Sequence, residues 1–150
     1  MPDDTQSGDR RALLDGLNED LAHEYAAVIL YRTYASAVTG PFRQELRQFF
    51  SSEIADELGH AQLLADKIIT LGGDPVLAAA PVKMAHEPRE MLQNALADEE
   101  ATITRYVERR RQAEAAGEAG LAVDLDDVIA DETKHRDELR LMLRRWPESQ

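Results

Sequence analysis

The sequence contains two Glu-x-x-His pairs, and each is preceded by a single glutamate at the same distance of 33 residues (57 − 24 and 132 − 99). In a helix, residues three positions apart lie on one face with β-carbons roughly 5–6 Å apart, so one metal ion can take a ligand from both. Carboxylate and imidazole are the ligands that remain for a metal centre without cysteine. The candidate metal-binding and catalytic residues are therefore Glu24, Glu57, His60, Glu99, Glu132 and His135.

The two halves of the chain repeat around these residues. Adding 75 to positions 17, 21, 24, 28, 31, 57 and 60 gives positions 92, 96, 99, 103, 106, 132 and 135, which hold the same residue except for Val28 and Ile103. A lone Glu-x-x-His is usually a coincidence on a solvated helix face. Six residues duplicated at one offset instead indicate an internal repeat, in which each half of the chain forms one helix pair. If the two pairs pack about a pseudo-twofold axis, four carboxylates and two imidazoles come together.

The charge of this set indicates what binds there. Four buried carboxylates would repel one another, and each would cost several kcal/mol in lost hydration unless it is protonated or paired. Two divalent cations cancel the four negative charges. Four oxygen donors and two nitrogen donors suit iron or manganese better than zinc, which usually takes a tetrahedral site richer in His or Cys. We therefore expect two iron ions per chain, with manganese as the alternative metal.

The elements that position these residues are long amphipathic helices. Apolar residues recur in steps of three and four, which predicts helices over residues 9–38, 41–71, 87–117 and 124–146. Residues 76–86 form a connection too long for a simple hairpin, and no segment alternates like a strand. The pattern predicts an all-α, antiparallel four-helix bundle with one long crossover between the second and third helices. We expect one domain over residues 1–150, with 1–8 and 147–150 as flexible tails.

Composition excludes several classes of function. There are 29 acidic against 17 basic residues, for a net charge of −12, so we expect no binding to nucleic acid or to anionic membranes. The absence of cysteine excludes disulfides, iron–sulfur clusters and cysteine-rich zinc sites. No basic leader or membrane-spanning apolar run occurs, which predicts a cytoplasmic protein.

Acidic residues beside the candidate ligands need separate assignments. Glu100 competes with Glu99, but only position 99 keeps the steps of three and four between Leu96 and Ile103. We interpret Glu53, one turn before Glu57, as a solvated acid rather than as a point of metal entry. Asp56 and Asp131 are each predicted to accept the free ring N–H of the histidine from the other half of the chain.

Two tyrosines and two further histidines also need an assignment. Tyr31 and Tyr106 each follow a candidate ligand glutamate by seven residues. We leave open whether they are core aromatics that use their hydroxyls on a neighbour or take part in electron transfer or ligand orientation. His23 and His86 stand outside the repeated pattern, and we interpret them as surface residues.

Three segments of the sequence resemble the bacterioferritin branch of the ferritin-like superfamily. They are Leu17-Asn18-Glu19-Asp20-Leu21-Ala22-His23-Glu24, Asp56-Glu57-Leu58-Gly59-His60-Ala61 and Asp131-Glu132-Thr133-Lys134-His135, and the likeness covers roughly residues 12–143. The resemblance implies a ferroxidase centre that oxidises Fe(II) with oxygen or peroxide. It implies that Glu57 and Glu132 bridge the metals, while Glu24 with His60 and Glu99 with His135 complete one iron each.

The sequence departs from that family in two places. Leu58 stands where bacterioferritins carry the methionine that ligates haem, so we expect no haem. The chain ends soon after Trp146-Pro147, where ferritin cages have a short fifth helix. We therefore expect a homodimer, packed through apolar residues of the first two helices, and leave a larger cage open.

Besides Fe(II) oxidation, a second hypothesis is a di-iron peroxidase or oxygenase that acts on another molecule. A third is a helical module whose metals only hold the bundle together. An oxygenase needs an apolar tunnel to the metals. The small residues Ala26, Ala27 and Ala61 either line such a tunnel or serve close helix packing.

Overall fold

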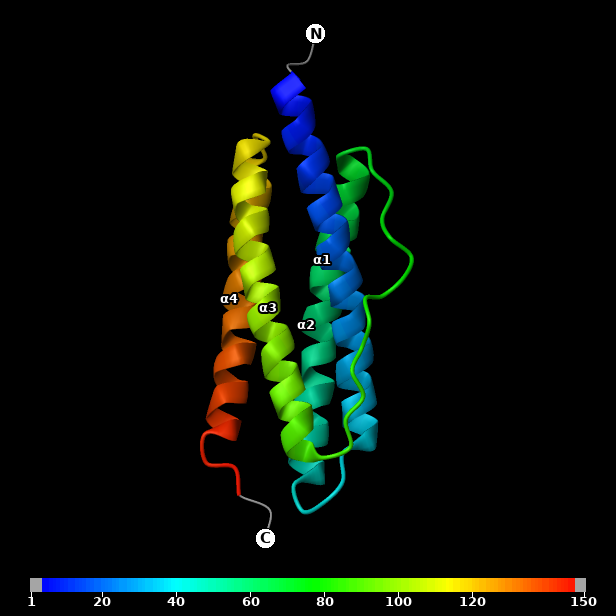
Figure 1. Cartoon of the computed structure of the whole chain (residues 1–150), viewed down its shortest axis with the longest axis vertical. Helices are drawn as coiled ribbons and strands as arrows, with labels where there is room; N and C mark the ends of the chain where they lie inside the picture. The colour runs from blue at the N-terminus through cyan, green and yellow to red at the C-terminus, as the bar shows by residue number, and fades with distance from the viewer. Residues whose placement is uncertain (1–3, 148–150) are drawn as a thin grey trace.

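Four long antiparallel helices form the computed structural model, which describes residues 4–147 (Figure 1). They are α1 (Asp4–Ala37), α2 (Arg43–Thr70), α3 (Pro88–Ala115) and α4 (Ala119–Leu143). No strand occurs in this range, so the predicted all-α bundle is confirmed. None of its helices is both long and apolar enough to cross a membrane. Residues 1–3 and 148–150, which belong to the predicted tails, lie outside the described range.

Two predicted helix starts are wrong. The first helix begins at Asp4 instead of residue 9, so residues 4–8, expected as a flexible tail, are helical and extend beyond the other helices (Figure 1). The last begins at Ala119 instead of Asp124, because Gly117 adopts a φ of 76° that turns the chain sharply after α3. Leu121 then continues the buried stripe of α4 backwards by one turn, and Gly120 lies inside this helix.

The end of α4 also differs from the prediction. The helix stops at Leu143, before Trp146. The Trp146 ring instead turns back onto Phe42, which lies just before α2, with ring centroids 5.5 Å apart in an edge-on arrangement. The C-terminal segment thus packs against the α1–α2 turn.

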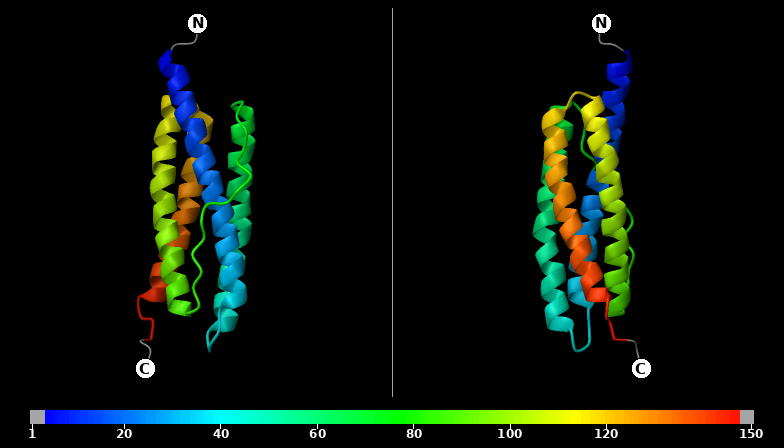
Figure 2. Two further views of the ribbon diagram at one scale, coloured as in Figure 1. Left: turned by 45° about the vertical axis from the view of Figure 1, so that its right-hand side comes forward. Right: turned by 90° about the vertical axis from the view of Figure 1, so that its left-hand side faces the viewer.

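The segment between α2 and α3 runs along α1 from one end of the bundle to the other, which confirms the predicted long crossover (Figures 1 and 2). It contains no helix or strand, yet α1 fixes it at several points. The backbone N–H of Ala80 donates to the Ala22 carbonyl at 2.9 Å, and the Tyr34 hydroxyl donates to the Lys83 carbonyl at 2.6 Å. The crossover is therefore an ordered strap over one face of the bundle.

Apolar residues fill the bundle in two separate clusters. One contains Leu17, Leu21, Leu64 and Leu125, and the other contains Leu30, Phe50, Leu92 and Leu139. On each helix the candidate ligands lie between residues of the two clusters, as Glu24 does between Leu21 and Leu30. The helices pack mainly as the pairs α1–α2 and α3–α4, and of the neighbouring helices α2 and α4 make the fewest contacts. The fold therefore places a polar layer at mid-bundle with an apolar layer on either side.

A buried ion pair fastens α1 to α3 beside that layer. Arg109 donates from Nε and Nη2 to the two Asp20 oxygens, at 2.7 and 3.1 Å, and both residues are buried. The guanidinium fits because position 16 has no side chain: a Cβ on Gly16 would lie 1.6 Å from Arg109 Nη1. Asp20 is one helical turn from Glu24, so this pair fixes the segment that carries a candidate ligand.

We predict that Gly16→Ala displaces Arg109 and breaks this pair, which should lower the free energy of unfolding by about 3 kcal/mol because a buried charge loses its partner. Gly59→Ala is the matched control, since a Cβ there meets nothing within 4 Å. It should raise the free energy of unfolding by roughly 0.5–1 kcal/mol through better helix propensity. Chemical denaturation of the metal-free proteins measures both changes, and equal stability of the two variants would contradict the account.

Candidate metal centre

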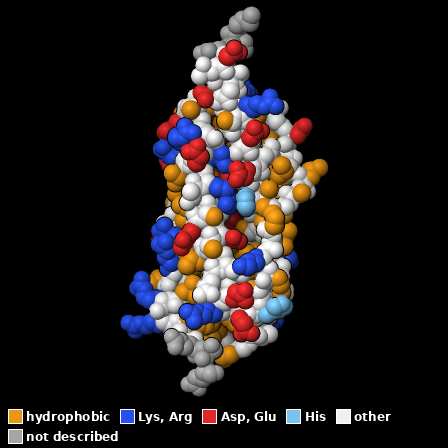
Figure 3. Space-filling view, viewed as in Figure 1, with side chains coloured by type: hydrophobic (Ala, Val, Ile, Leu, Met, Phe, Trp, Pro, Cys, Tyr) orange, Lys and Arg blue, Asp and Glu red, His pale blue; other side chains and the backbone are white. Residues whose placement is uncertain are grey.

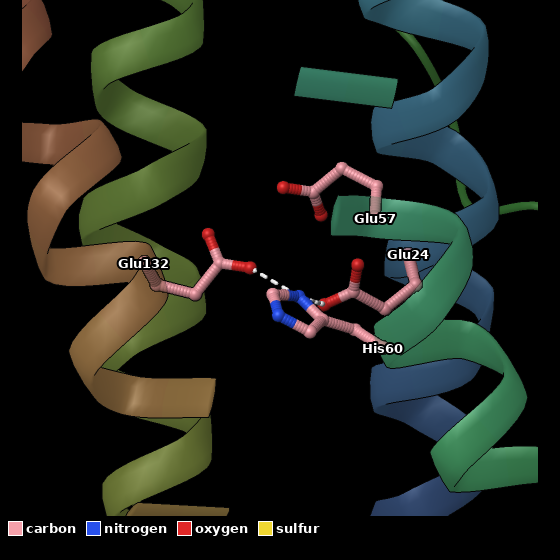
Figure 4. Close-up of side chains that lie close together, drawn as sticks. All are labelled: Glu24, Glu57, His60 and Glu132. Atoms are coloured by element: carbon pink, nitrogen blue, oxygen red, sulfur yellow. Dashed lines mark ion pairs between the residues drawn. The ribbon is translucent and has the colours of Figure 1, made fainter. Parts of the chain in front are cut away.

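The six residues predicted as ligands meet inside the polar layer, and each of the four helices contributes to the cluster. All six are buried, with exposed fractions of 6% or less: Glu24, Glu57, His60, Glu99, Glu132 and His135. Figure 4 shows Glu24 and His60 facing Glu132 from the opposite side of the bundle, with Glu57 beside them. The convergence predicted from the repeat is therefore what the structure shows.

The donor atoms form two adjoining groups, each with all its atoms within 4.8 Å of one another. One group is Glu24, Glu57, His60 and Glu132; the other is Glu53, Glu57, Glu99 and His135. Glu57 belongs to both. Glu132 also faces both, because its Oε1 lies 2.9 Å from His60 Nδ1 and its Oε2 lies 3.5 Å from His135 Nδ1. The arrangement is two donor sets joined by two shared carboxylates.

Several of these donor atoms are buried without a hydrogen-bond partner among the described residues: Glu24 Oε2, Glu57 Oε1, Glu99 Oε2, Glu132 Oε2 and His135 Nδ1. Such atoms are rare in folded proteins, since each loses its hydration without compensation. Cations coordinated by these oxygens and nitrogens would remove that cost. The residues present therefore fit two divalent metal ions.

The outer nitrogen of each histidine binds an aspartate from the other half of the chain. His60 Nε2 lies 3.1 Å from Asp131, and His135 Nε2 lies 3.0 Å from Asp56. These are the contacts predicted from the sequence. An acceptor at Nε2 keeps a proton on that nitrogen, so Nδ1, which faces the glutamates, is the nitrogen that can bind a metal once its own proton is displaced.

The two repeated tyrosines each donate to a candidate ligand of the other half. Tyr31 binds Glu99 Oε1 at 2.6 Å, and Tyr106 binds Glu24 Oε1 at 2.5 Å. Both rings are buried. Each phenol thus occupies one carboxylate oxygen, so the tyrosines orient Glu99 and Glu24.

The interpretation of Glu53 as a solvated acid is wrong. This residue is 7% exposed, and its Oε2 lies 2.9 Å from His135 Nε2. The pseudo-symmetric position holds Val128, so His60 has no equivalent neighbour. The repeat gave no signal for Glu53, but its place in the buried stripe of α2, one turn before Glu57, could have shown it.

Of the remaining predictions from the sequence, some are confirmed and others are wrong. Glu99 is buried and Glu100 exposed, as the spacing predicted. His86 is exposed as expected, whereas His23 is half-buried and lines a pocket beside the candidate centre. The buried Asp20–Arg109 pair was not predicted, because neither residue has a charged counterpart in the other half.

Burial and the contacts within the cluster act in opposite directions on its protonation in the metal-free protein: hydrogen bonds from Glu99 and the histidines lower the pKa of Glu132 despite its burial. Burial raises the pKa of Glu24, and it raises the pKa of Glu57 and Glu99 further still, where neighbouring carboxylates add to the effect. For His60, burial is outweighed by hydrogen bonding to Glu132 and by the charge of Glu24, which together raise its pKa to about 9. The metal-free cluster therefore retains protons that coordination to metal would displace.

We predict that the metal-free protein loses stability as pH rises from about 5 to about 9. Groups whose pKa is higher in the folded state bind more protons when folded, so their stabilisation is complete below the unfolded pKa and disappears as pH passes the folded pKa. Thermal unfolding across this range measures the effect. Protein loaded with Mn(II), which cancels the same charges, should keep or gain stability, and a metal-free protein that gains stability would contradict the assignment.

Comparison with known proteins agrees with this geometry. The family model described as Ferritin-like domain matches residues 14–149, so the chain belongs to that family. A ferritin-like, diiron-carboxylate protein from Bacillus anthracis str. Ames is 50% identical, with a TM-score of 0.88 over 90% of this chain and 97% of that one. The chain is thus a ferritin-like protein with diiron-carboxylate relatives.

More distant similarities define the fold alone. The bacterioferritin of Desulfovibrio desulfuricans is 20% identical, with a TM-score of 0.84 over 95% of this chain and 84% of that one. Dps from Thermosynechococcus elongatus is 22% identical, with a TM-score of 0.88 over 93% and 95%. A curated relative, the nutrient stress-induced DNA-binding protein of a Nostoc species, is 30% identical over 71% of this chain, and the match spans 63% of its length.

Proposed function

We propose that this protein binds two Fe(II) ions and oxidises them to Fe(III) with dioxygen or hydrogen peroxide. The observation that carries the proposal is the pair of adjoining donor sets that share Glu57 and Glu132. Two ions held side by side can give up one electron each to the same small oxidant. The iron is then both the cation that neutralises the charge of the cluster and the substrate that is oxidised.

The proposed ligand roles follow the two donor sets. Glu24 with His60 holds one iron, Glu99 with His135 holds the other, and Glu57 and Glu132 bridge them. Glu53 is not needed to balance the charge of two divalent ions (4 − 4 = 0). Its contact with the outer nitrogen of His135 instead makes the surroundings of the second iron more acidic than those of the first.

The alternative, oxidation of a separate organic substrate, finds less support. The pocket that reaches the candidate ligands Glu24, Glu57 and Glu99 has a volume of about 70 Å³, whereas drug-sized ligands occupy pockets of roughly 300–1,000 Å³. We also propose that the protein does not bind nucleic acid, although a relative is named as DNA-binding, because the net charge of −12 would repel phosphates.

For assembly we propose a homodimer without haem. Ile29 and Leu58 are 46% and 51% exposed on α1 and α2, and such apolar surface suits a second copy of the chain. Leu30, next to Ile29 on the same helix, is buried in the core and is not part of this surface. Light scattering distinguishes a dimer from a larger shell, and haem absorbance after incubation with haem would contradict the assignment of Leu58.

The proposed function predicts that Glu99→Ala loses rapid Fe(II) oxidation, by at least roughly a hundredfold, because one iron loses a terminal carboxylate and the centre keeps excess positive charge. The matched control is Glu100→Ala, next along the same helix but exposed. It should oxidise Fe(II) at the parent rate. Stopped-flow absorbance measures both rates, and circular dichroism checks that both variants remain helical. Equal rates for the two variants would contradict the proposal.

A further inference from the structure

A small pocket between α1 and α3 reaches the candidate centre from one side of the bundle. It has a volume of about 70 Å³, and Pro81 of the crossover forms part of its wall. Three candidate ligands line it: Glu24, Glu57 and Glu99. The small residues Ala26 and Ala27, considered from the sequence as a tunnel lining, are also in its wall, whereas Ala61 belongs to the apolar core.

The internal repeat explains where this pocket lies. Four pairs of lining residues are related by the offset of 75 positions: His23 and Asp98, Glu24 and Glu99, Ala27 and Thr102, and Leu30 and Arg105. The pocket therefore lies on the pseudo-twofold axis that relates the two donor sets. A molecule that enters there approaches both irons equally, as an acceptor of one electron from each must.

The two walls of the pocket differ in chemistry. Beside the candidate ligands, α1 contributes mainly apolar side chains, whereas α3 contributes Thr102 and Arg105 at the positions equivalent to Ala27 and Leu30. Arg105 donates from Nη2 to Thr102 Oγ1 at 2.8 Å. Its Nε is buried, lies 3.9 Å from Asp20, and has no hydrogen-bond acceptor among the described residues. The α3 wall therefore contributes a cationic side chain whose Nε lacks a hydrogen-bond acceptor among the described residues, in the same pocket that the candidate ligands line.

The distribution of charge indicates that cations reach the candidate centre from a different side than the α1–α3 pocket. At the α1–α3 pocket the positive Arg105 offsets Asp98, and Figure 3 shows acidic and basic side chains intermixed over this face. On the opposite side, the exposed Asp56 and the half-buried Asp131 accompany Glu53 between α2 and α4, the neighbouring helices with the fewest contacts. A divalent cation is attracted to the acidic side, whereas an uncharged molecule gains nothing there.

We infer that the α1–α3 pocket admits and holds hydrogen peroxide as the oxidant, with Arg105 and Thr102 as positioning residues. The inference rests on the proposed Fe(II) oxidation. A pocket of about 70 Å³ has room for a small molecule such as peroxide but is far below the roughly 300–1,000 Å³ of pockets that hold drug-sized ligands. In the reaction two Fe(II) ions each lose one electron, the O–O bond of the peroxide breaks, and two protons from solvent complete two water molecules.

Ala27→Leu tests the route, because three added carbon atoms would fill the pocket without removing a candidate ligand. The matched control is Ala12→Leu, an exposed position on the same helix. Each protein is loaded anaerobically with Fe(II) and mixed with hydrogen peroxide in a stopped-flow instrument. We expect Ala27→Leu to bind as much Fe(II) as the parent but to oxidise it on the order of tenfold more slowly, and Ala12→Leu to match the parent.

Arg105→Met tests the positioning role separately from the route. It removes the donors while keeping a long apolar stem, so oxidation by peroxide should slow severalfold. Oxidation by dioxygen, which gains little from hydrogen-bond donors, should keep the parent rate. Equal slowing with both oxidants would overturn the preference for peroxide, since a general disturbance of α3 would act on both reactions.

Two results would overturn the inference while leaving the proposed function intact. The first is oxidation at the parent rate by Ala27→Leu, since a pocket that can be filled without effect is not the route of the oxidant. A lower Fe(II) stoichiometry in Ala27→Leu would show that the pocket serves cations instead. A parent protein that neither binds nor oxidises Fe(II) would overturn the proposed function first, and the inference with it.

Discussion

Four carboxylates and two imidazoles share the water-poor centre of this bundle, and the rest of the structure depends on balancing their charge. Desolvation of an unpaired carboxylate costs several kcal/mol, so four of them cannot remain ionised together without countercharge. Protons can supply it, and the raised pKa values of Glu24, Glu57 and Glu99 show that burial favours them. Two divalent cations can supply it as well, while also occupying the donor atoms that have no hydrogen-bond partner.

The residues around the cluster exclude water from it and fix the positions of its charged side chains. Apolar layers on both sides along the bundle exclude water, and the Asp20–Arg109 pair holds α1 against α3 close to Glu24. Tyr31 and Tyr106 bind Glu99 and Glu24 across the pseudo-twofold axis, and the outer aspartates bind the histidines. The exceptions to the repeat then give the two faces different characters. Glu53 on α2 is equivalent in the repeat to Val128 on α4, and Arg105 on α3 is equivalent to Leu30 on α1.

Much of this could be predicted from the sequence, because helical period and internal repetition are both local signals. Glu24 and Glu99 interrupt apolar stripes at equivalent positions, and the burial of Tyr31 and Tyr106 follows from the same register, although the glutamates that they bind were not predicted. Features without a repeated partner were not predictable in this way. The burial of Glu53 depends on how closely α4 approaches α2, and the place of Arg109 depends on space left by Gly16 on another helix. The early start of α4 likewise depends on the turn at Gly117.

The most direct test of the central claim is an anaerobic titration of the metal-free protein with Fe(II), which records bound iron and released protons together. The account predicts saturation at about two Fe(II) per chain, with proton release, because the cations replace the protons of the buried glutamates. Binding of one iron or none, or binding without proton release at neutral pH, would contradict it.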